Sequence, residues 1–135
     1  YVTLMFMVLD QEEHTLNIVN AGHWPPLRRT RKGEVQKVEC ASGLPVGIEP
    51  DVDYETTHVE LAPEDRLCIY TDGVIDAMNE QRQPYGNNRL QESLTRAGPN
   101  AQAILEHVQQ SVWQYMGNAE QHDDTTFVCF GRTQT

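Results

Sequence analysis

The feature that most constrains the fold is a short apolar run that ends on an aspartate and a glycine. Residues Leu67 to Tyr70 are apolar without interruption, a pattern typical of a strand buried on both faces. Thr71, Asp72 and Gly73 follow directly, so the strand would hold a carboxylate at the edge of a sheet, where ligands and metals are commonly bound. An isolated Asp-Gly pair is more often a plain turn. The rest of the chain decides between these interpretations.

Further strands are expected on both sides of this run. The segment Val2 to Leu9 has the pattern of a central strand, and with Leu16 to Asn20 it forms a predicted hairpin. The last strand, Thr125 to Phe130, again has the pattern of burial on both faces. The remaining strands are expected at 27–30, 34–39 and 54–61.

Two helices are expected between the Asp-Gly pair and the last strand. Asn88 would cap the first helix, and Asn100 would cap a longer one that ends near Gly117. Their apolar stripes are interpreted as core faces, because a sheet needs covering helices. At 135 residues the chain is long enough for one domain with its own core. Residues 1–135 are therefore treated as a single α+β domain.

The charge balance limits the kinds of partner. With 20 acidic and 10 basic residues the net charge is −10, which opposes binding to nucleic acid or to an anionic membrane. No segment is long enough to span a bilayer. Half of the basic residues lie between Arg28 and Lys37, on the tip of a predicted hairpin. This hairpin is either simply solvated or a contact for an acidic partner or a phosphate.

The three cysteines favour a reducing compartment. Cys40, Cys68 and Cys129 are far apart, odd in number and form no Cys-x-x-Cys pair. They are interpreted as reduced thiols, with two of them in strands, and a cytoplasmic location is expected.

Carboxylates at strand ends are the main candidates for chemistry. Asp123 and Asp124 precede the last strand, and Asp72 follows an earlier one. If these strands are antiparallel neighbours, the carboxylates meet, and they repel one another unless a cation such as Mg²⁺ or Mn²⁺ neutralises them. The alternative is a solvated turn at Asp123. Signatures of a serine, cysteine or histidine nucleophile are absent from the sequence.

Several motifs follow one another in an order that resembles a known family. They are Asn20 to Pro26, Ser42 to Gly47, Leu61 to Asp65, Tyr70 to Val74 and Asp123 to Thr126. Together they resemble the SpoIIE-type branch of the type 2C (PPM, metal-dependent) protein serine/threonine phosphatases, over nearly the whole chain. The resemblance implies a sandwich of mostly antiparallel sheets covered by helices. It also implies two Mg²⁺ or Mn²⁺ ions, held by aspartates, that activate a water to attack a phosphoserine or phosphothreonine.

The resemblance also assigns the metal site. Asp72 matches the metal-binding aspartate of the Thr-Asp-Gly motif, and Asp123 matches that of the terminal Asp-Asp-x-Thr motif. Thr71, Gly73 and Asp124 stand beside them, as further ligands or as neighbours that orient the ligands. No catalytic residue is expected apart from the metal ligands.

His23 lies in the Ala-Gly-His turn that characterises the branch. A role in shaping the turn is expected for it rather than catalysis. One departure lies at Thr125, which stands where the family's terminal motif usually has a branched apolar residue.

A larger departure is an absence. The family's first metal-binding motif, of the type Asp-x-x-Gly-His/Lys-Gly, has no counterpart in the sequence. Because the chain also opens directly on a strand, we expect it to be the C-terminal portion of a phosphatase domain truncated at its N-terminus. We expect this portion alone to be inactive, and to dimerise through exposed sheet surface.

Two functions remain open on the sequence. The first is a bacterial signalling phosphatase that acts on a phosphorylated protein. The family's usual substrates are anti-anti-sigma proteins of the STAS type, and a sensor or receiver domain usually precedes the phosphatase domain. The second is a phosphatase-like module that binds a partner without catalysis. The presence of both Asp72 and Asp123 favours the enzyme.

Overall fold

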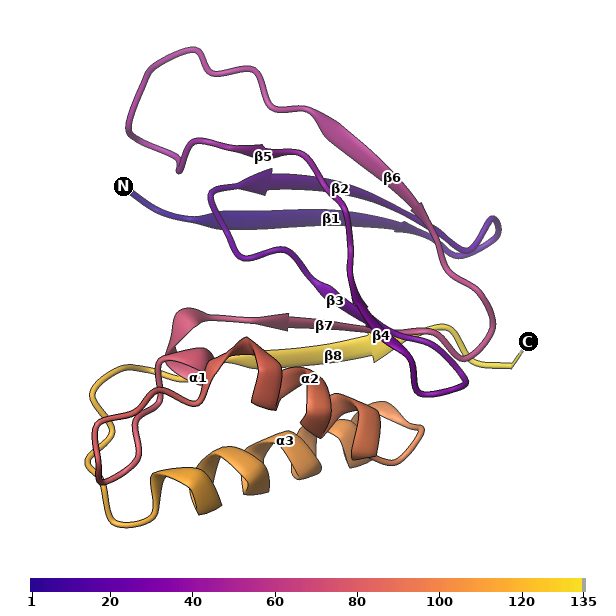
Figure 1. Cartoon of the computed structure of the whole chain (residues 1–135). Helices are drawn as coiled ribbons and strands as arrows, with labels where there is room; N and C mark the ends of the chain where they lie inside the picture. Colours follow the sequence, from indigo (N-terminus) through magenta and orange to yellow (C-terminus); the bar gives the residue numbers. More distant parts are fainter. Residues whose placement is uncertain (135) are drawn as a thin grey trace.

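Two sheets and a pair of helices form three layers in the computed structural model, which describes residues 1–134 (Figure 1). The first sheet contains β1 (Leu4–Asp10), β2 (Thr15–Ala21), β5 (Ser42–Gly43) and β6 (Thr56–Glu60). The second contains β3 (Leu27–Arg29), β4 (Val35–Lys37), β7 (Arg66–Tyr70) and β8 (Phe127–Gly131). All pairings between these strands are antiparallel except the one between β2 and β5.

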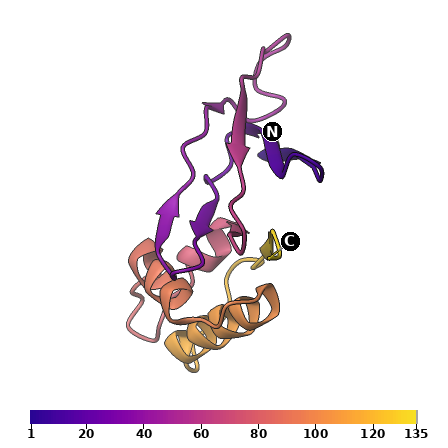
Figure 2. The same cartoon turned by 90° about the vertical axis from the view of Figure 1, so that its right-hand side faces the viewer.

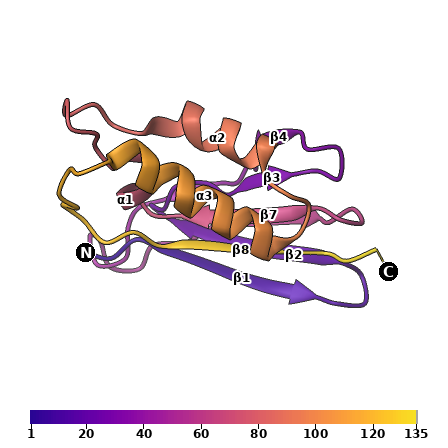
Figure 3. The same cartoon turned by 90° about the horizontal axis from the view of Figure 1, so that it is seen from below.

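The helices cover the face of the second sheet that points away from the first. A short helix, α1 (Asp72–Ile75), follows β7, and α2 (Gly86–Arg96) and α3 (Ala101–Met116) lie side by side. Figure 2 shows the first sheet and the helices at opposite ends of the stack, and Figure 3 shows α2 toward β4 and α3 toward β8. The predicted α+β sandwich with a helical layer is confirmed.

Strand β7 contributes to both apolar cores. Successive side chains of a strand point to opposite faces. Leu67 packs with the core between the sheets, whereas Cys68 and Tyr70 pack with the core under the helices. All three side chains are buried, which confirms the predicted buried strand.

The first strand is not the central strand that was predicted, and the last strand is not buried on both faces as predicted. Among residues 1–134, β1 pairs only with β2 and β8 pairs only with β7. Leu4, Phe6 and Val8 of β1 are exposed, and so is Val128 of β8. The prediction was wrong because an apolar run shows that a strand can be buried but does not show which neighbours cover it.

The caps of the two long helices were predicted with mixed success. The side chain of Asn100 accepts a hydrogen bond from the Ala103 amide at 2.8 Å, and Gly117 ends α3 with a φ of +58°. Asn88, however, does not cap α2, which begins at Gly86 after Tyr85. Tyr85 is buried and its hydroxyl lies 2.6 Å from the Ser111 hydroxyl on α3. Packing of this tyrosine, rather than a capping side chain, fixes where α2 starts.

The basic residues of the hairpin divide between the interior and the surface, and Arg29 is the one that is buried. The buried Arg29 donates from Nε to the Leu94 carbonyl at 2.7 Å and from an Nη to the Ala97 carbonyl at 2.8 Å. These carbonyls belong to the last turn of α2 and to its C-cap residue, where backbone acceptors lack helical partners. Arg31 pairs with Glu64 at 2.8 Å on the surface. Arg29 is therefore neither solvated nor available to an acidic partner or a phosphate. Neither interpretation of the hairpin applies to this residue.

Within residues 1–134, no helix combines the length and the apolar character that crossing a membrane would require.

The hydrogen bonds of Arg29 lead to a stability prediction. Arg29→Met leaves the Leu94 and Ala97 carbonyls buried without donors, and we expect it to lower the free energy of unfolding by about 2–3 kcal/mol. Urea denaturation followed by circular dichroism measures the loss. The control is Arg31→Met, whose side chain is 72% exposed, and which should cost no more than about 0.5 kcal/mol. Similar losses in the two variants would contradict the structural role of Arg29.

Candidate functional site

The Thr71-Asp72-Gly73 segment lies where β7 ends and α1 begins. Asp72 is the first residue of α1, and its side chain is exposed. Two positions before Asp72, Tyr70 is buried and donates from its hydroxyl to the Asn87 side-chain oxygen at 3.0 Å. Burial raises the pKa of Tyr70, so this phenol stays neutral. The carboxylate of Asp72 thus stands in solvent at the end of a strand whose last side chain is fixed in the core.

The segment is fastened to the residues that precede β8. The Thr71 amide donates to the Thr126 carbonyl at 3.1 Å, and the Thr126 amide donates to the Thr71 hydroxyl at 3.1 Å. The Thr125 hydroxyl donates to the Gly73 carbonyl at 3.4 Å. These bonds continue the antiparallel pairing of β7 with β8. The condition that the sequence left open, antiparallel pairing of these two strands, is met in the structure, and their carboxylate-bearing ends lie side by side.

Gly73 permits the close approach of the two segments. It is buried, and a β-carbon at this position would overlap the Asp124 carbonyl oxygen and lie 3.3 Å from the Thr125 α-carbon. Both obstacles are backbone atoms, which cannot rotate away as a side chain can. A glycine is required here for its lack of a side chain, and the distance between the two carboxylate-bearing segments depends on it.

Asp123 and Asp124 are both exposed at the other half of the site. The Asp123 carboxylate accepts a hydrogen bond from the Asp124 amide at 2.8 Å, and Gln121 donates to the Asp123 carbonyl at 2.9 Å. A pocket of about 170 Å³ opens beside Asp123 and is also lined by Gly73.

Sequence reasoning missed three titratable residues that line this pocket. They are Asp76, Glu120 and His122. Asp76 follows Asp72 by one helical turn, and the other two lie within the three positions before Asp123. Only the short helix α1 and the loop after α3 bring them together, and neither was predicted in detail.

The Ala-Gly-His turn is held by its own polar groups. Asn20 receives a hydrogen bond from the His23 amide at 2.8 Å and donates to the His23 carbonyl at 2.9 Å. The Nδ1 of His23 lies 2.9 Å from the Trp24 carbonyl. His23 is not among the residues that line the pocket beside Asp123, although β2 and β7 end on the same side of the molecule (Figure 1).

The carboxylate oxygens of Asp72 and Asp123 are donors of the type that a hard divalent cation prefers. Carboxylate oxygens are preferred ligands of Mg²⁺ and Mn²⁺, and the side chains of Asp72 and Asp123 are exposed rather than consumed by ion pairs. Among residues 1–134, however, no three His, Cys, Asp or Glu side chains form a group that could hold a metal ion. The two aspartates fit part of a coordination shell, and water or further groups would have to complete it.

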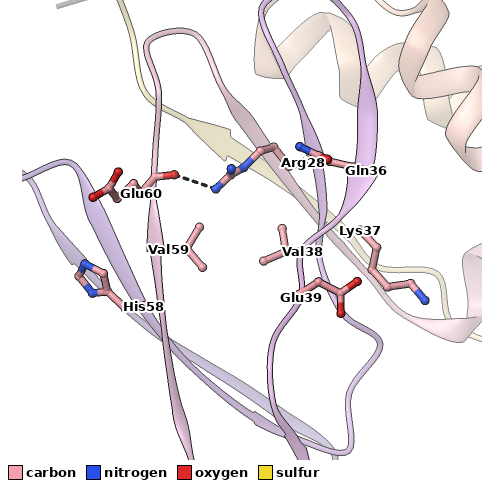
Figure 4. A pocket seen from close by; sticks show the side chains of 8 residues that line it. All are labelled: Arg28, Gln36, Lys37, Val38, Glu39, His58, Val59 and Glu60. Carbon is pink, nitrogen blue, oxygen red and sulfur yellow. Dashed lines mark hydrogen bonds between the residues drawn. The ribbon is translucent and has the colours of Figure 1, made fainter.

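A larger groove lies at the opposite end of the sheets. It has a volume of about 410 Å³ and opens between the edge strands β4 and β6 (Figure 4). Arg28 and Lys37 line it together with Glu39 and Glu60, so its charges largely balance. Arg28 donates to the Glu60 carbonyl at 2.7 Å. Neither Asp72 nor Asp123 lines this groove, and it has no part in the candidate metal site.

Comparisons with known proteins agree on one family. The family model described as Stage II sporulation protein E (SpoIIE) matches residues 1–133. Protein IcfG of Synechocystis sp. is 30% identical over 132 residues, which are 98% of this chain and 21% of IcfG. Phosphoserine phosphatase RsbU of Bacillus subtilis is 23% identical over 135 residues, which are 98% of this chain and 39% of RsbU. The chain spans less than half of either relative.

A solved structure shows the same fold. The phosphatase domain of the cell fate determinant SpoIIE from Bacillus subtilis, presoaked with Mn, superimposes with a TM-score of 0.74 at 18% sequence identity. The match covers 98% of this chain and 57% of that one.

The close approach at Gly73 generates a second prediction. Gly73→Ala forces the α1 segment away from the backbone of Asp124, and we expect a loss of about 2 kcal/mol or more in the free energy of unfolding. Thr71→Ser is the control, because it keeps the hydroxyl that bonds Thr126 and should cost about 0.5 kcal/mol or less. Urea denaturation compares the two variants. If Gly73→Ala had the same free energy of unfolding as the wild type, a glycine would not be required at this close approach.

Proposed function

The chain belongs to the SpoIIE family, and on that premise we propose that it forms part of a metal-dependent protein serine/threonine phosphatase. The substrate is a phosphoserine or phosphothreonine on a partner protein. The observation that carries the proposal is the pairing of the Thr71-Asp72-Gly73 segment with residues 124–126, which places two motif aspartates at neighbouring strand ends. The proposal is also supported by the relative RsbU, which is named a phosphoserine phosphatase.

Asp72 and Asp123 are the residues that would hold Mg²⁺ or Mn²⁺, with two ions in the intact site. When bound, such ions lower the pKa of a water and offset negative charge on the phosphoryl oxygens. The chain's own contribution is to hold its carboxylates in place. The hydrogen bonds of Thr71 fix Asp72, and Gly73 lets the Asp123 segment approach. Asp124 supports the same segment or provides a further ligand.

The partners follow from the family. A phosphorylated anti-anti-sigma protein of the STAS type is the proposed substrate, and a sensor or receiver domain in the same protein is the proposed source of regulation. A cytoplasmic location in a bacterium agrees with the free thiols of all three cysteines.

Loss of either aspartate should abolish hydrolysis. We expect the complete gene product to release phosphate from a phosphoserine protein or p-nitrophenyl phosphate in the presence of Mn²⁺, and Asp72→Asn or Asp123→Asn to lower kcat/KM by about 100-fold or more. Glu13→Gln is the control, because Glu13 is an exposed acid in the β1–β2 loop. Equal rates in all three variants would leave the non-catalytic, partner-binding module as the better reading.

Calorimetric titration with Mn²⁺ gives this test a readout independent of turnover. Residues 1–135 by themselves should bind Mn²⁺ only weakly, on the order of millimolar, because two carboxylates form an incomplete shell, and they should show no hydrolysis. Asp72→Asn should weaken this binding further. Micromolar affinity in residues 1–135 would contradict the incomplete shell.

We also propose that two copies of the chain associate through β1. Leu4, Phe6 and Val8 alternate along this edge strand and face one side, and Phe6 is 56% exposed. Exposed apolar strips of this kind favour association. Light scattering should give the mass of a dimer, and Phe6→Lys should reduce it to a monomer. Glu13→Lys should leave the dimer intact, and a monodisperse wild-type monomer would refute the proposal.

A further inference from the structure

Cys68 and Cys129 face each other across the β7–β8 pair. They are directly opposite in the strand register, and their sulfur atoms are 3.7 Å apart. Both are free thiols. This contact could not be predicted from the sequence, because 61 positions separate the two residues.

The hydrogen-bond pattern shows that the strands are close at this point. In an antiparallel pair, opposite residues alternate between hydrogen-bonded and non-hydrogen-bonded positions. The Thr71 amide bonds the opposite Thr126 carbonyl, and the Arg132 amide bonds the opposite Asp65 carbonyl. Counting inward from either end makes Cys68 and Cys129 a non-hydrogen-bonded pair. The α-carbons of such a pair lie about 4.5 Å apart, within the range that a disulfide spans, about 4.4–6.8 Å.

The two thiols differ in accessibility and acidity. Cys68 is fully buried in the core beneath the helices, whereas Cys129 on the edge strand is partly exposed. The hydrogen bond from the Cys68 thiol lowers the pKa of Cys129, and the nearby charges of Arg66 and Arg29 lower it further, against the effect of burial. The same hydrogen bond, together with burial, raises the pKa of Cys68. Cys129 is therefore the thiol that ionises and meets a reagent first.

We propose that Cys68 and Cys129 form a reversible disulfide across β7 and β8 when a hydroperoxide reaches Cys129. The Cys129 thiolate attacks one peroxide oxygen, the O–O bond breaks, and a sulfenic acid forms while the departing hydroxide or alkoxide takes up a proton. Cys68 then gives up its proton and attacks the Cys129 sulfur. The S–O bond breaks and hydroxide leaves with that proton as water. With hydrogen peroxide, two thiols and one peroxide become one disulfide and two waters.

The bond would link the strands that carry the candidate site. Cys68 precedes Asp72 by four residues, and Cys129 follows Asp123 by six. The disulfide would tie these strand ends together covalently and close the long chain segment that contains all three helices. The inference depends on the strand pairing alone and stands whether or not the chain is a phosphatase.

Intact mass measurement after hydrogen peroxide tests the proposal. The complete chain should lose two hydrogen atoms, and a tryptic map should join the Cys68 and Cys129 peptides. Dithiothreitol should restore both thiols. Oxidation should also raise the thermal unfolding midpoint by about 10 °C, because the closed segment is long. This shift should vanish in Cys129→Ala and persist in Cys40→Ser.

Three outcomes in the wild-type protein would overturn the proposal. The first is wild-type protein that keeps three free thiols after peroxide treatment. The second is a sulfinic acid at Cys129 with Cys68 still reduced, which would mean that the strands do not let the sulfurs meet. The third is a bond through Cys40, within or between chains, in place of the predicted one. The proposal would also be overturned if oxidation raised the unfolding midpoint of Cys129→Ala as much as that of the wild type.

Discussion

The backbone pairing between β7 and β8 is the interaction on which the rest of the structure depends. Strand β7 has a core on each face, with Leu67 on one side and Cys68 and Tyr70 on the other, so it cannot slip by one residue without exposing apolar side chains and burying a polar one. Its register therefore fixes β8, and β8 fixes the loop before it. The buried side chains of β7 therefore determine where Asp123 lies relative to Asp72, although Leu67 and Cys68 are several residues away from both.

Part of this arrangement could be predicted from the sequence. A four-residue apolar run followed by Thr-Asp-Gly was enough to locate β7 and its end, and the acidic pair was enough to locate the start of the last strand, though not its pairing with β7. Asn100 and Gly117 marked α3 correctly, because caps act through neighbours within one turn. These features depend on local patterns.

The features that could not be predicted depend on contacts between distant segments. Whether β1 and β8 are central or edge strands is decided by what lies beside them. The start of α2 is set by Tyr85 packing on α3. Arg29 looked like a surface charge in a basic hairpin, and only the position of α2 shows that it is buried. The facing cysteines were missed for the same reason, since no local pattern reports the partner of a strand.

Strand β8 is far from its partner β7 in the sequence, and this separation has a consequence for biosynthesis. Residues 66–70 leave the ribosome more than 50 positions before residues 127–131, which they must pair with. Until then β7 has an open edge and the acidic segment around Asp123 has nothing to dock on. A nascent chain that stops short of Phe127 can build the first sheet, but it has neither the paired aspartates nor the facing thiols. Until residues 127–131 have been synthesised, the nascent chain therefore exposes a strand edge of β7 that chaperones and proteases can recognise.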